Sequence, residues 1–211
     1  MKKAAVGFRG HSGWSAMVVV SLHDGAPIVL RRRRAQLVET FSYTFRQPYH
    51  TAEKMDFADA AGFISGVQKE SEQLAHKALR ELQTELEQEG YRLDRGSLLL
   101  AAGRPLPELE KILKAHALIH MADGELFREA LRQASERCGM RLTCVREKEL
   151  LEHCSKAFSV KEPVLLRQVT ELGKGIGPPW SQDEKYATLA AWLALGASQA
   201  RRRTKQISVR A

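Results

Sequence analysis

Short apolar runs, broken by turn residues, occupy the first part of the chain. Ala4–Phe8 is apolar, Ser15–Leu22 is rich in valine, and Pro27–Leu30 continues directly into four arginines. The Asp24-Gly25 pair between the last two runs is the strongest short-range signal for a hairpin. The pattern therefore predicts three consecutive strands.

A change to helical spacing follows. Over residues 54–89 the apolar positions recur every three, four or seven residues, which predicts one long amphipathic helix. Gly62 and Gly66 each cost such a helix about 1 kcal/mol relative to alanine, so we expect a kink or a break near them. Before this helix, Thr40–Phe45 can extend the sheet, and 46–50 reads as a loop because its proline cannot donate in a strand ladder.

The second half alternates strands and helices. Ser97–Ala102 is an uninterrupted apolar run of strand length, typical of a central strand covered on both faces. Asp123 is expected to cap a helix. The other expected elements are a short helix over 105–114, a helix over 125–137, a fifth strand over 141–145, helices over 147–157 and 162–172, a glycine- and proline-rich loop over 173–179, and an apolar last helix over 181–195. This order predicts an α/β fold with a mixed five-stranded sheet flanked by helices.

Length and composition favour one domain in an ordinary globular protein. The chain has 211 residues, of which 44% are hydrophobic and 27% charged. We expect a single domain over 1–196 and a basic, disordered tail over 197–211. No apolar run approaches the roughly 20 residues that span a bilayer, so no membrane partner is expected. Three cysteines without Cys-x-x-Cys spacing favour a reducing, cytoplasmic location.

Positive charge is concentrated in two segments. The net charge is +8; Arg31, Arg32, Arg33 and Arg34 form one basic run, and the tail carries Arg201, Arg202, Arg203 and Lys205. The remainder of the chain is close to neutral, so these residues are candidates for binding nucleic acid or another polyanion. In a strand, Arg31 and Arg33 must face away from Arg32 and Arg34, which favours an exposed strand end. The alternative is a solvated strand end and a frayed terminus.

The β-β-β-α-β-α-β-α order resembles the ribonuclease H-like superfamily, and its layout is most similar to that of RuvC-type Holliday-junction resolvases. Ala4–Gly13 resembles the first strand and turn of that family, and Leu98–Gly103 its fourth strand. Ser181–Leu195 resembles the helix that completes its active site. The resemblance covers nearly the whole chain in topology, and it implies a ribonuclease H-like fold.

The resemblance also implies where metal-binding acids should lie. In that family, carboxylates on the first strand, the fourth strand and the last helix hold two divalent metals for phosphodiester cleavage. Here those positions fall on Arg9, Ala102 and the pair Asp183 and Glu184. With most of the acids absent, the resemblance implies a degenerate site without two-metal nuclease activity, and Mg²⁺ is expected only if that activity remains. Acids in a first helical turn also favour the helix dipole, which is the alternative for Asp183 and Glu184.

Cationic and aromatic residues follow several of the expected elements. If the topology holds, they form a ligand-binding site in which Arg and Lys take phosphate oxygens and a Trp stacks on a base. Two histidines among them, His11 and His50, are also candidates for catalysis, together with Asp183 and Glu184. The alternative is that both Trp side chains are half-buried plugs. The candidates are Arg9, His11, Trp14, Tyr49, His50, Lys174, Trp180 and Lys185.

A metal-like spacing occurs once. His116 and His120 stand four residues apart with Glu125 nearby, but the Glu that zinc peptidases carry directly after the first His is absent. Core or surface histidines are the favoured alternative, and no cofactor is predicted.

Three functions are compatible with these features. The first is a ribonuclease H-like protein that binds nucleic acid or another polyanion without two-metal cleavage. The second is an enzyme that acts on a phosphorylated small molecule or nucleic acid through Arg9, His11, His50 and Lys174. The third is an interaction scaffold, in which the long helix and the last helix dock other subunits or a second copy, as in a homodimer. A steep dependence of binding on salt separates the first from the third.

Overall fold

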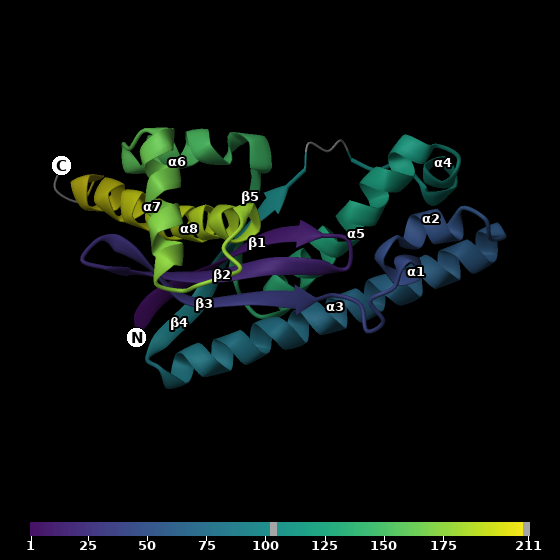
Figure 1. Cartoon of the computed structure of the whole chain (residues 1–211), viewed down its shortest axis with the longest axis horizontal. Helices are drawn as coiled ribbons and strands as arrows, with labels where there is room; N and C mark the ends of the chain where they lie inside the picture. Colours follow the sequence, from purple (N-terminus) through teal and green to yellow (C-terminus); the bar gives the residue numbers. More distant parts are fainter. Residues whose placement is uncertain (102–104, 209–211) are drawn as a thin grey trace.

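One mixed sheet organises the molecule (Figure 1). The computed structural model describes residues 1–101 and 105–208, with side chains described up to Gly196. The strands are β1 (Lys2–His11), β2 (Trp14–His23), β3 (Ala26–Gln36), β4 (Tyr91–Leu100) and β5 (Arg141–Arg146). Their order is β3-β2-β1-β4-β5, with antiparallel pairs among the first three strands and parallel pairs from β1 to β4 and from β4 to β5. The predicted mixed five-stranded sheet is confirmed.

Helices cover both faces of this sheet (Figure 1). Helices α3 and α5 pack on one face, and α6, α7 and α8 pack on the other. The short helices α1, α2 and α4 lie beyond one end of the sheet. The bounds are α1 Tyr43–Arg46, α2 Pro48–Ala52, α3 Phe57–Gln88, α4 Leu109–Leu113, α5 His116–Arg137, the 3-10 turn η1 Glu147–Glu149, α6 Leu150–Phe158, α7 Glu162–Lys174 and α8 Gln182–Ser208.

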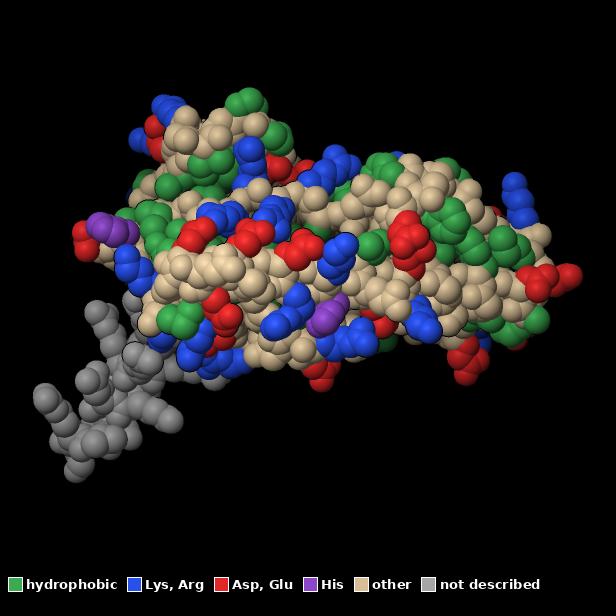
Figure 2. Space-filling view, turned by 90° about the horizontal axis from the view of Figure 1, so that it is seen from below, with side chains coloured by type: hydrophobic (Ala, Val, Ile, Leu, Met, Phe, Trp, Pro, Cys, Tyr) green, Lys and Arg blue, Asp and Glu red, His purple; other side chains and the backbone are tan. Residues whose placement is uncertain are grey.

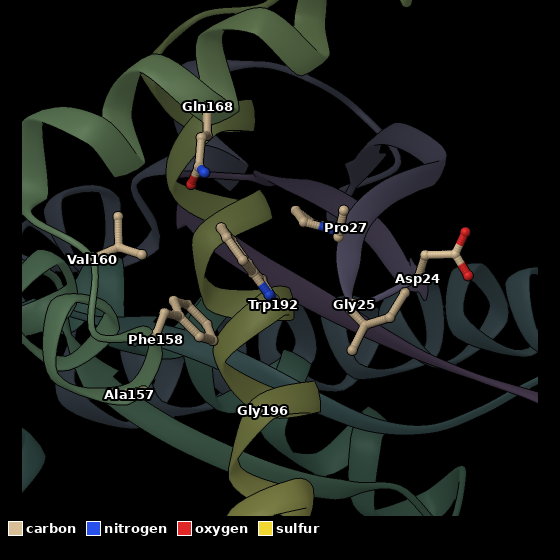
Figure 3. A pocket seen from close by; sticks show the side chains of 11 residues that line it. Asp24, Gly25, Pro27, Ala157, Phe158, Val160, Gln168, Trp192 and Gly196 are labelled. Atoms are coloured by element: carbon tan, nitrogen blue, oxygen red, sulfur yellow. The ribbon is translucent and has the colours of Figure 1, made fainter.

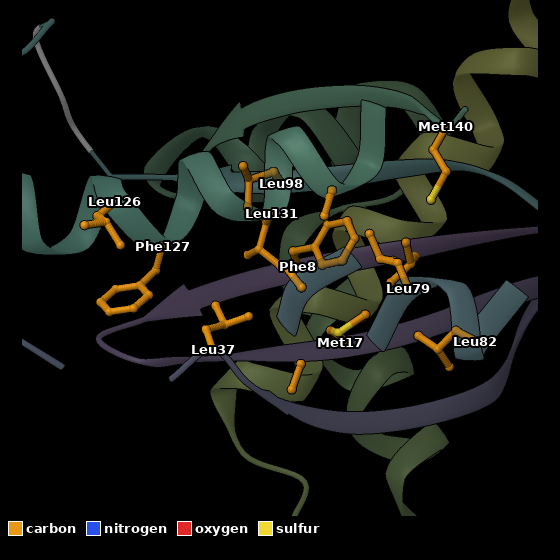
Figure 4. Packing of buried hydrophobic residues seen from close by; sticks show 14 of the residues in the cluster. Phe8, Met17, Leu37, Leu79, Leu82, Leu98, Leu126, Phe127, Leu131 and Met140 are labelled. Carbon is orange, nitrogen blue, oxygen red and sulfur yellow. The ribbon is translucent and has the colours of Figure 1, made fainter. Parts of the chain in front are cut away.

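Two apolar layers hold the helices to the sheet. On the α3 and α5 side, Phe8 and Met17 from the strands pack with Leu79 and Leu131 from the helices, all of them buried (Figure 4). Complete burial of a side chain of this size stabilises the fold by about 1.5–3 kcal/mol. The alternation along β1 and β2 therefore fixes which face each helix covers.

On the other face, α8 lies directly against β1 at Gly7. A Cβ at this position would lie 1.8 Å from the carbonyl oxygen of Ala187, so only glycine allows this approach. The close packing brings the first turn of α8 next to the carboxyl end of β1. That juxtaposition positions the candidate site described below.

The arginine run lies near the end of β3, as expected, and of its four residues only Arg34 is exposed. Strand β3 continues through it to Gln36, with Arg31 opposite Val19 and Arg33 opposite Met17, because β2 continues alongside it as a partner. The predicted alternation is confirmed: Arg31 and Arg33 reach acids of α3, while the Arg32 guanidinium reaches the loop between α7 and α8.

Two expectations before and within the long helix are wrong. Residues 43–52 form α1 and α2 in place of a strand extension and a loop, and Pro48 occupies the first position of α2, where its missing N–H costs nothing. Helix α3 is unbroken through Gly62 and Gly66, both of which face open space. The buried face of α3 supplies the stability that these glycines remove.

The later elements begin or end elsewhere than expected. Strand β4 begins at Tyr91, and α5 begins at His116, so that Asp123 lies buried within α5 and does not cap it. The predicted fourth-strand position Ala102 falls outside the described residues. Helix α8 continues to Ser208, past the expected end at Leu195; the proposed domain boundary at residue 196 stays a prediction. Among the described residues, no helix is long and apolar enough to cross a membrane.

Candidate functional site

Arg9, near the carboxyl end of β1, binds two carboxylates from distant parts of the chain. Its Nε donates to Oε2 of Glu147 at 2.9 Å, and its Nη2 donates to Oε1 of the same residue at 2.7 Å. Its Nη1 donates to Oδ1 of Asp183. The hydrogen bonds and charge of Glu147, followed by those of Asp183, raise the pKa of Arg9 against an opposing effect of burial. One guanidinium therefore pairs with both acids and compensates one of their two negative charges.

Local structure explains this convergence. Glu147 follows β5 directly and begins η1, and Asp183 lies in the first turn of α8. Side chains alternate along β1, so Arg9 faces the same side of the sheet as Gly7, where α8 packs. On β4, the side chain that packs into the α8 layer at this level is Leu99, which is 3% exposed and carries no charge.

These residues do not fit a pair of divalent metals. Two hard cations need several carboxylate oxygens turned toward them. In the described part of the site, a guanidinium stands on β1 and a leucine on β4, and both Glu147 and Asp183 are engaged by Arg9.

Glu184 has a structural role at the start of α8. Its Oε2 accepts hydrogen bonds from the backbone N–H and the hydroxyl of Ser181, both at 2.7 Å. The Ser181 hydroxyl in turn accepts the N–H of Asp183 at 3.1 Å. This is a capping box, in which a Ser and a Glu three residues later satisfy free N–H groups of the first turn. Glu184, 8% exposed, is therefore bound to its own helix end.

A row of rings and guanidinium groups extends from this acid pair to the surface. Nε2 of His11 lies 2.8 Å from Oδ1 of Asp183, and the His11 ring stacks on Trp14 with a centroid distance of 4.2 Å. The guanidinium of Arg34 lies 3.9 Å from the centroid of the Trp14 ring and 5.4 Å from that of Phe41. Arg46 covers the same Phe41 ring at 4.4 Å.

We call Trp14, Arg34, Phe41 and Arg46 the arginine–aromatic row. Arg34 and Phe41 are exposed, whereas Trp14 and Arg46 are half-buried. Among the described residues, neither arginine of the row forms an ion pair with a carboxylate. The row is thus a cationic surface backed by aromatic rings.

Tyr49 and His50 belong to a different cluster on α2 and α5. The backbone N–H of Tyr49 donates to Oδ1 of Asp123 at 2.7 Å, and Nδ1 of His50 is bonded to Oδ2 of the same carboxylate. The rings of His116 and His120 lie against His50, at 5.3 and 4.3 Å between centroids. Burial raises the pKa of Asp123 despite these hydrogen bonds, and burial also raises the pKa of the Tyr49 hydroxyl.

Glu125, which the sequence suggests as a metal ligand beside His116 and His120, pairs with arginines of its own helix. Its carboxylate accepts from Nε of Arg128 at 2.8 Å and lies 3.7 Å from Arg132. The third imidazole beside His116 and His120 is His50, from a helix far away in the sequence.

The residues around the glycine loop also separate. Lys174 pairs with Glu171 of its own helix at 2.7 Å. Trp180 packs against Gly173, where a Cβ would lie 2.1 Å from the indole, and its Nε1 donates to the Val169 carbonyl at 2.7 Å. Trp180 is therefore the half-buried plug of the alternative interpretation. Lys185 is half-buried in the first turn of α8.

Arg9, His11, His50 and Lys174, the residues expected to act on a phosphorylated small molecule or nucleic acid, do not form one site. Helix α2, which carries His50, and helix α7, which ends at Lys174, lie toward opposite ends of the long axis (Figure 1). Only Arg9 and His11 of the four residues proposed for that enzyme meet, through Asp183.

Most of the basic run on β3 is already paired. Arg31 binds Glu89 and Arg33 binds Glu85, both on α3. The Arg32 guanidinium donates to carbonyls of the α7–α8 loop, at 2.7 Å to Gly177. Basic and acidic side chains accordingly intermingle on the α3 side of the molecule (Figure 2). The predicted tail residues, Arg201 to Arg203 and Lys205, lie outside the residues with described side chains.

One hollow of about 580 Å³ lies away from these clusters, between the β2–β3 turn and helices α6, α7 and α8. Trp192 and Phe158 stack at its base, 4.1 Å apart (Figure 3). Gln168 supplies a polar side chain to the lining, whereas the Asp24 side chain points away from the hollow. We find no convergent set of charged groups among its lining residues.

Solved structures share this architecture over nearly the whole chain. Thermus thermophilus RuvC in complex with a Holliday junction substrate matches with a TM-score of 0.55 and 8% identity, over 94% of this chain and 96% of that one. The RuvC-like fold is thereby shown. A second structure of Thermus thermophilus RuvC matches with a TM-score of 0.51 and 9% identity, over 93% of this chain and 96% of that one. The yeast mitochondrial Holliday junction resolvase matches at 0.53 and 12%, over 96% and 85%.

At sequence level the comparisons found nothing. No protein-family model matches the chain, and no curated protein matches it. The RuvC-like fold therefore rests on topology and on the structural matches.

Local sequence patterns do not point to several residues of the site. Glu147 reads only as the start of a helix, although an acid directly after a parallel strand lies at the edge where α/β sheets bind ligands. Phe41 and Arg46 fall in segments that the sequence predicts as a strand extension and a loop. Arg34 is one of four consecutive arginines, and no sequence signal links it to Trp14 across the β2–β3 pair.

Proposed function

We propose that this chain binds nucleic acid through its RuvC-like fold and does not cleave phosphodiester bonds by a two-metal mechanism. Fold alone does not establish function, so the proposal rests on the site. The observation that carries it is the Arg9 guanidinium, bound to Glu147 and Asp183 at the edge of the sheet that adjoins the arginine–aromatic row.

The arginine–aromatic row supports the binding part of the proposal. Guanidinium groups bind phosphate oxygens in a planar, bidentate manner, and exposed rings offer stacking surfaces to unpaired bases. Arg34 and Phe41 are exposed and adjacent, and the Arg46 guanidinium also lies over the Phe41 ring. One of the structural neighbours is itself a complex with a Holliday junction, which makes a branched DNA the first ligand to test.

Arg9 supports the absence of two-metal cleavage. Its positive charge lies where metal ions would need to meet Glu147 and Asp183, and a divalent cation would have to displace three hydrogen bonds to reach them.

The binding test compares variants of the row. We expect an Arg34→Gln/Arg46→Gln variant to bind a fluorescent four-way junction more weakly than the wild type, as measured by fluorescence anisotropy. If each arginine neutralises one phosphate, the slope of log K against log salt falls by about 2 in magnitude. Arg167→Gln, which removes an exposed charge on α7, is the matched control and should leave the slope unchanged. Equal slopes in the row variant and the wild type would contradict the proposed surface.

The cleavage test uses the full chain with Mg²⁺ or Mn²⁺. Junction, duplex and single-stranded DNA and RNA should all remain intact on denaturing gels. Metal-dependent cleavage that disappears in Asp183→Asn would show that this acid still serves a metal centre and would refute that part of the proposal.

A further inference from the structure

The second cluster, on α2 and α5, has the components of a transition-metal site. The imidazoles of His50, His116 and His120 place their nitrogen atoms within 4.8 Å of one another. Nε2 of His116 and Nε2 of His120 are 3.1 Å apart. Two ligand nitrogens on one tetrahedral Zn²⁺ lie about 3.3 Å apart at the usual bond length of about 2.0–2.1 Å, so this pair is almost at chelating distance.

The ring orientations agree with convergence on one point. The three ring pairs are inclined by 89°, 65° and 79°, so no two rings stack face to face. His116 and His120 are one helical turn apart at the start of α5, which places both on the same face. Helix α2 brings His50 to that face.

Asp123 orients the third imidazole. Its carboxylate is buried and accepts the backbone N–H of Tyr49 as well as Nδ1 of His50. When Asp123 is ionised its oxygens can only accept, so Nδ1 of His50 then carries the proton and Nε2 keeps its lone pair for a metal. Metal-binding histidines are commonly held in this way by a carboxylate behind the ring.

We infer that His50, His116 and His120 bind one Zn²⁺ ion, with Asp123 as a positioning residue for His50. Three neutral imidazoles suit a borderline ion such as Zn²⁺ and not the hard cations Mg²⁺ and Ca²⁺, which prefer oxygen. His116 and His120 are exposed, so the fourth coordination position opens to solvent and accommodates water or an exogenous ligand. The inference does not rest on the proposed nucleic-acid binding, because it uses none of the residues of the arginine–aromatic row.

The test measures metal binding by untagged, EDTA-treated full-length protein in a Cys144→Ser background, which removes an exposed thiol as a competing ligand. Isothermal titration with ZnCl₂ should give one ion per chain. Co²⁺ should give the visible absorption of a tetrahedral site. His116→Gln and His120→Gln should each weaken Zn²⁺ binding at least tenfold, whereas His153→Gln, at an exposed histidine of α6, should bind as the parent does.

Asp123→Asn should weaken Zn²⁺ binding by about 10- to 100-fold, as loss of a carboxylate behind a ligating imidazole does elsewhere. Because His116 and His120 are exposed, their variants keep the proposal testable even if Asp123→Asn does not fold. Parent-like Zn²⁺ affinity in both His116→Gln and His120→Gln would overturn the site, and parent-like affinity in a folded Asp123→Asn would overturn the role given to Asp123.

Discussion

Replacing Arg9 by glutamine is the most direct perturbation of the site. The change removes the guanidinium that binds Glu147 and Asp183 and leaves two partly buried carboxylates facing each other. We expect the folded protein to lose stability and to gain a weak affinity for Mg²⁺ that the wild type lacks.

The magnitude follows from the exposure of the three groups. Removing one partner of a fully buried ion pair costs about 3–5 kcal/mol. Here the side chain of Arg9 is 18% exposed, and those of Glu147 and Asp183 are 34% and 20% exposed, so water compensates in part. We therefore expect a loss of about 2–3 kcal/mol, equivalent to a fall in Tm of about 4–12 °C for a chain of this size.

Thermal unfolding followed by circular dichroism measures both effects. At Mg²⁺ concentrations tenfold above the dissociation constant, binding to the folded state alone should return about 1.4 kcal/mol to Arg9→Gln. Mg²⁺ is a suitable probe of the carboxylates because hard cations prefer oxygen ligands and bind the imidazoles of His50, His116 and His120 poorly. The matched control is Arg128→Gln, which removes a 12%-exposed arginine paired with Glu125 and should show no Mg²⁺ dependence.

Two results would refute the reasoning. A Tm equal to that of the wild type would show that Arg9 does not hold the acids together. Equal stabilisation of wild type and Arg9→Gln by Mg²⁺ would show that the carboxylates are open to metal even with Arg9 present.

Three further predictions concern other parts of the chain. Gly7→Ala should lower the free energy of unfolding by about 3 kcal/mol or prevent folding, because α8 leaves no room for a Cβ. Gly62→Ala, where a Cβ would face open space, should raise the free energy of unfolding by up to about 1 kcal/mol. Urea titrations measure both changes. The exposed Cys144 should react with a thiol reagent at pH 8 in the folded protein, while Cys154, whose burial raises its thiol pKa to about 12, should react only on unfolding; equal rates would contradict this. A chain ending at Gly196 should bind duplex DNA with a salt slope lower by up to about 4 or 5, because it lacks five cations, the four tail residues named above and Arg210. An unchanged slope would remove the tail from the binding surface.

Local patterns predicted the elements whose signals are strong within a few residues. The Asp24-Gly25 hairpin, the long helix and the apolar strand that becomes β4 were all found near their expected places. Errors arose where a neighbouring element overrode the local signal. Residues 43–52 form α1 and α2 where a strand extension and a loop were expected, and packing against the core keeps α3 continuous through two glycines.

The sequence by itself determined the α/β class, the order of strands and helices, and the absence of an acid at position 9, because these depend on periodicity and on single residue identities. Only the tertiary structure decided which side chains meet. Glu147 and Asp183 lie 138 and 174 residues from Arg9. They reach it because the parallel strands β1 and β5 end at the same edge of the sheet, on either side of β4, and α8 packs directly against β1. His50 joins His116 and His120 for the same reason, since the packing of α2 on α5 places them side by side. Contacts of this range depend on how the core layers pack, and no local pattern encodes them.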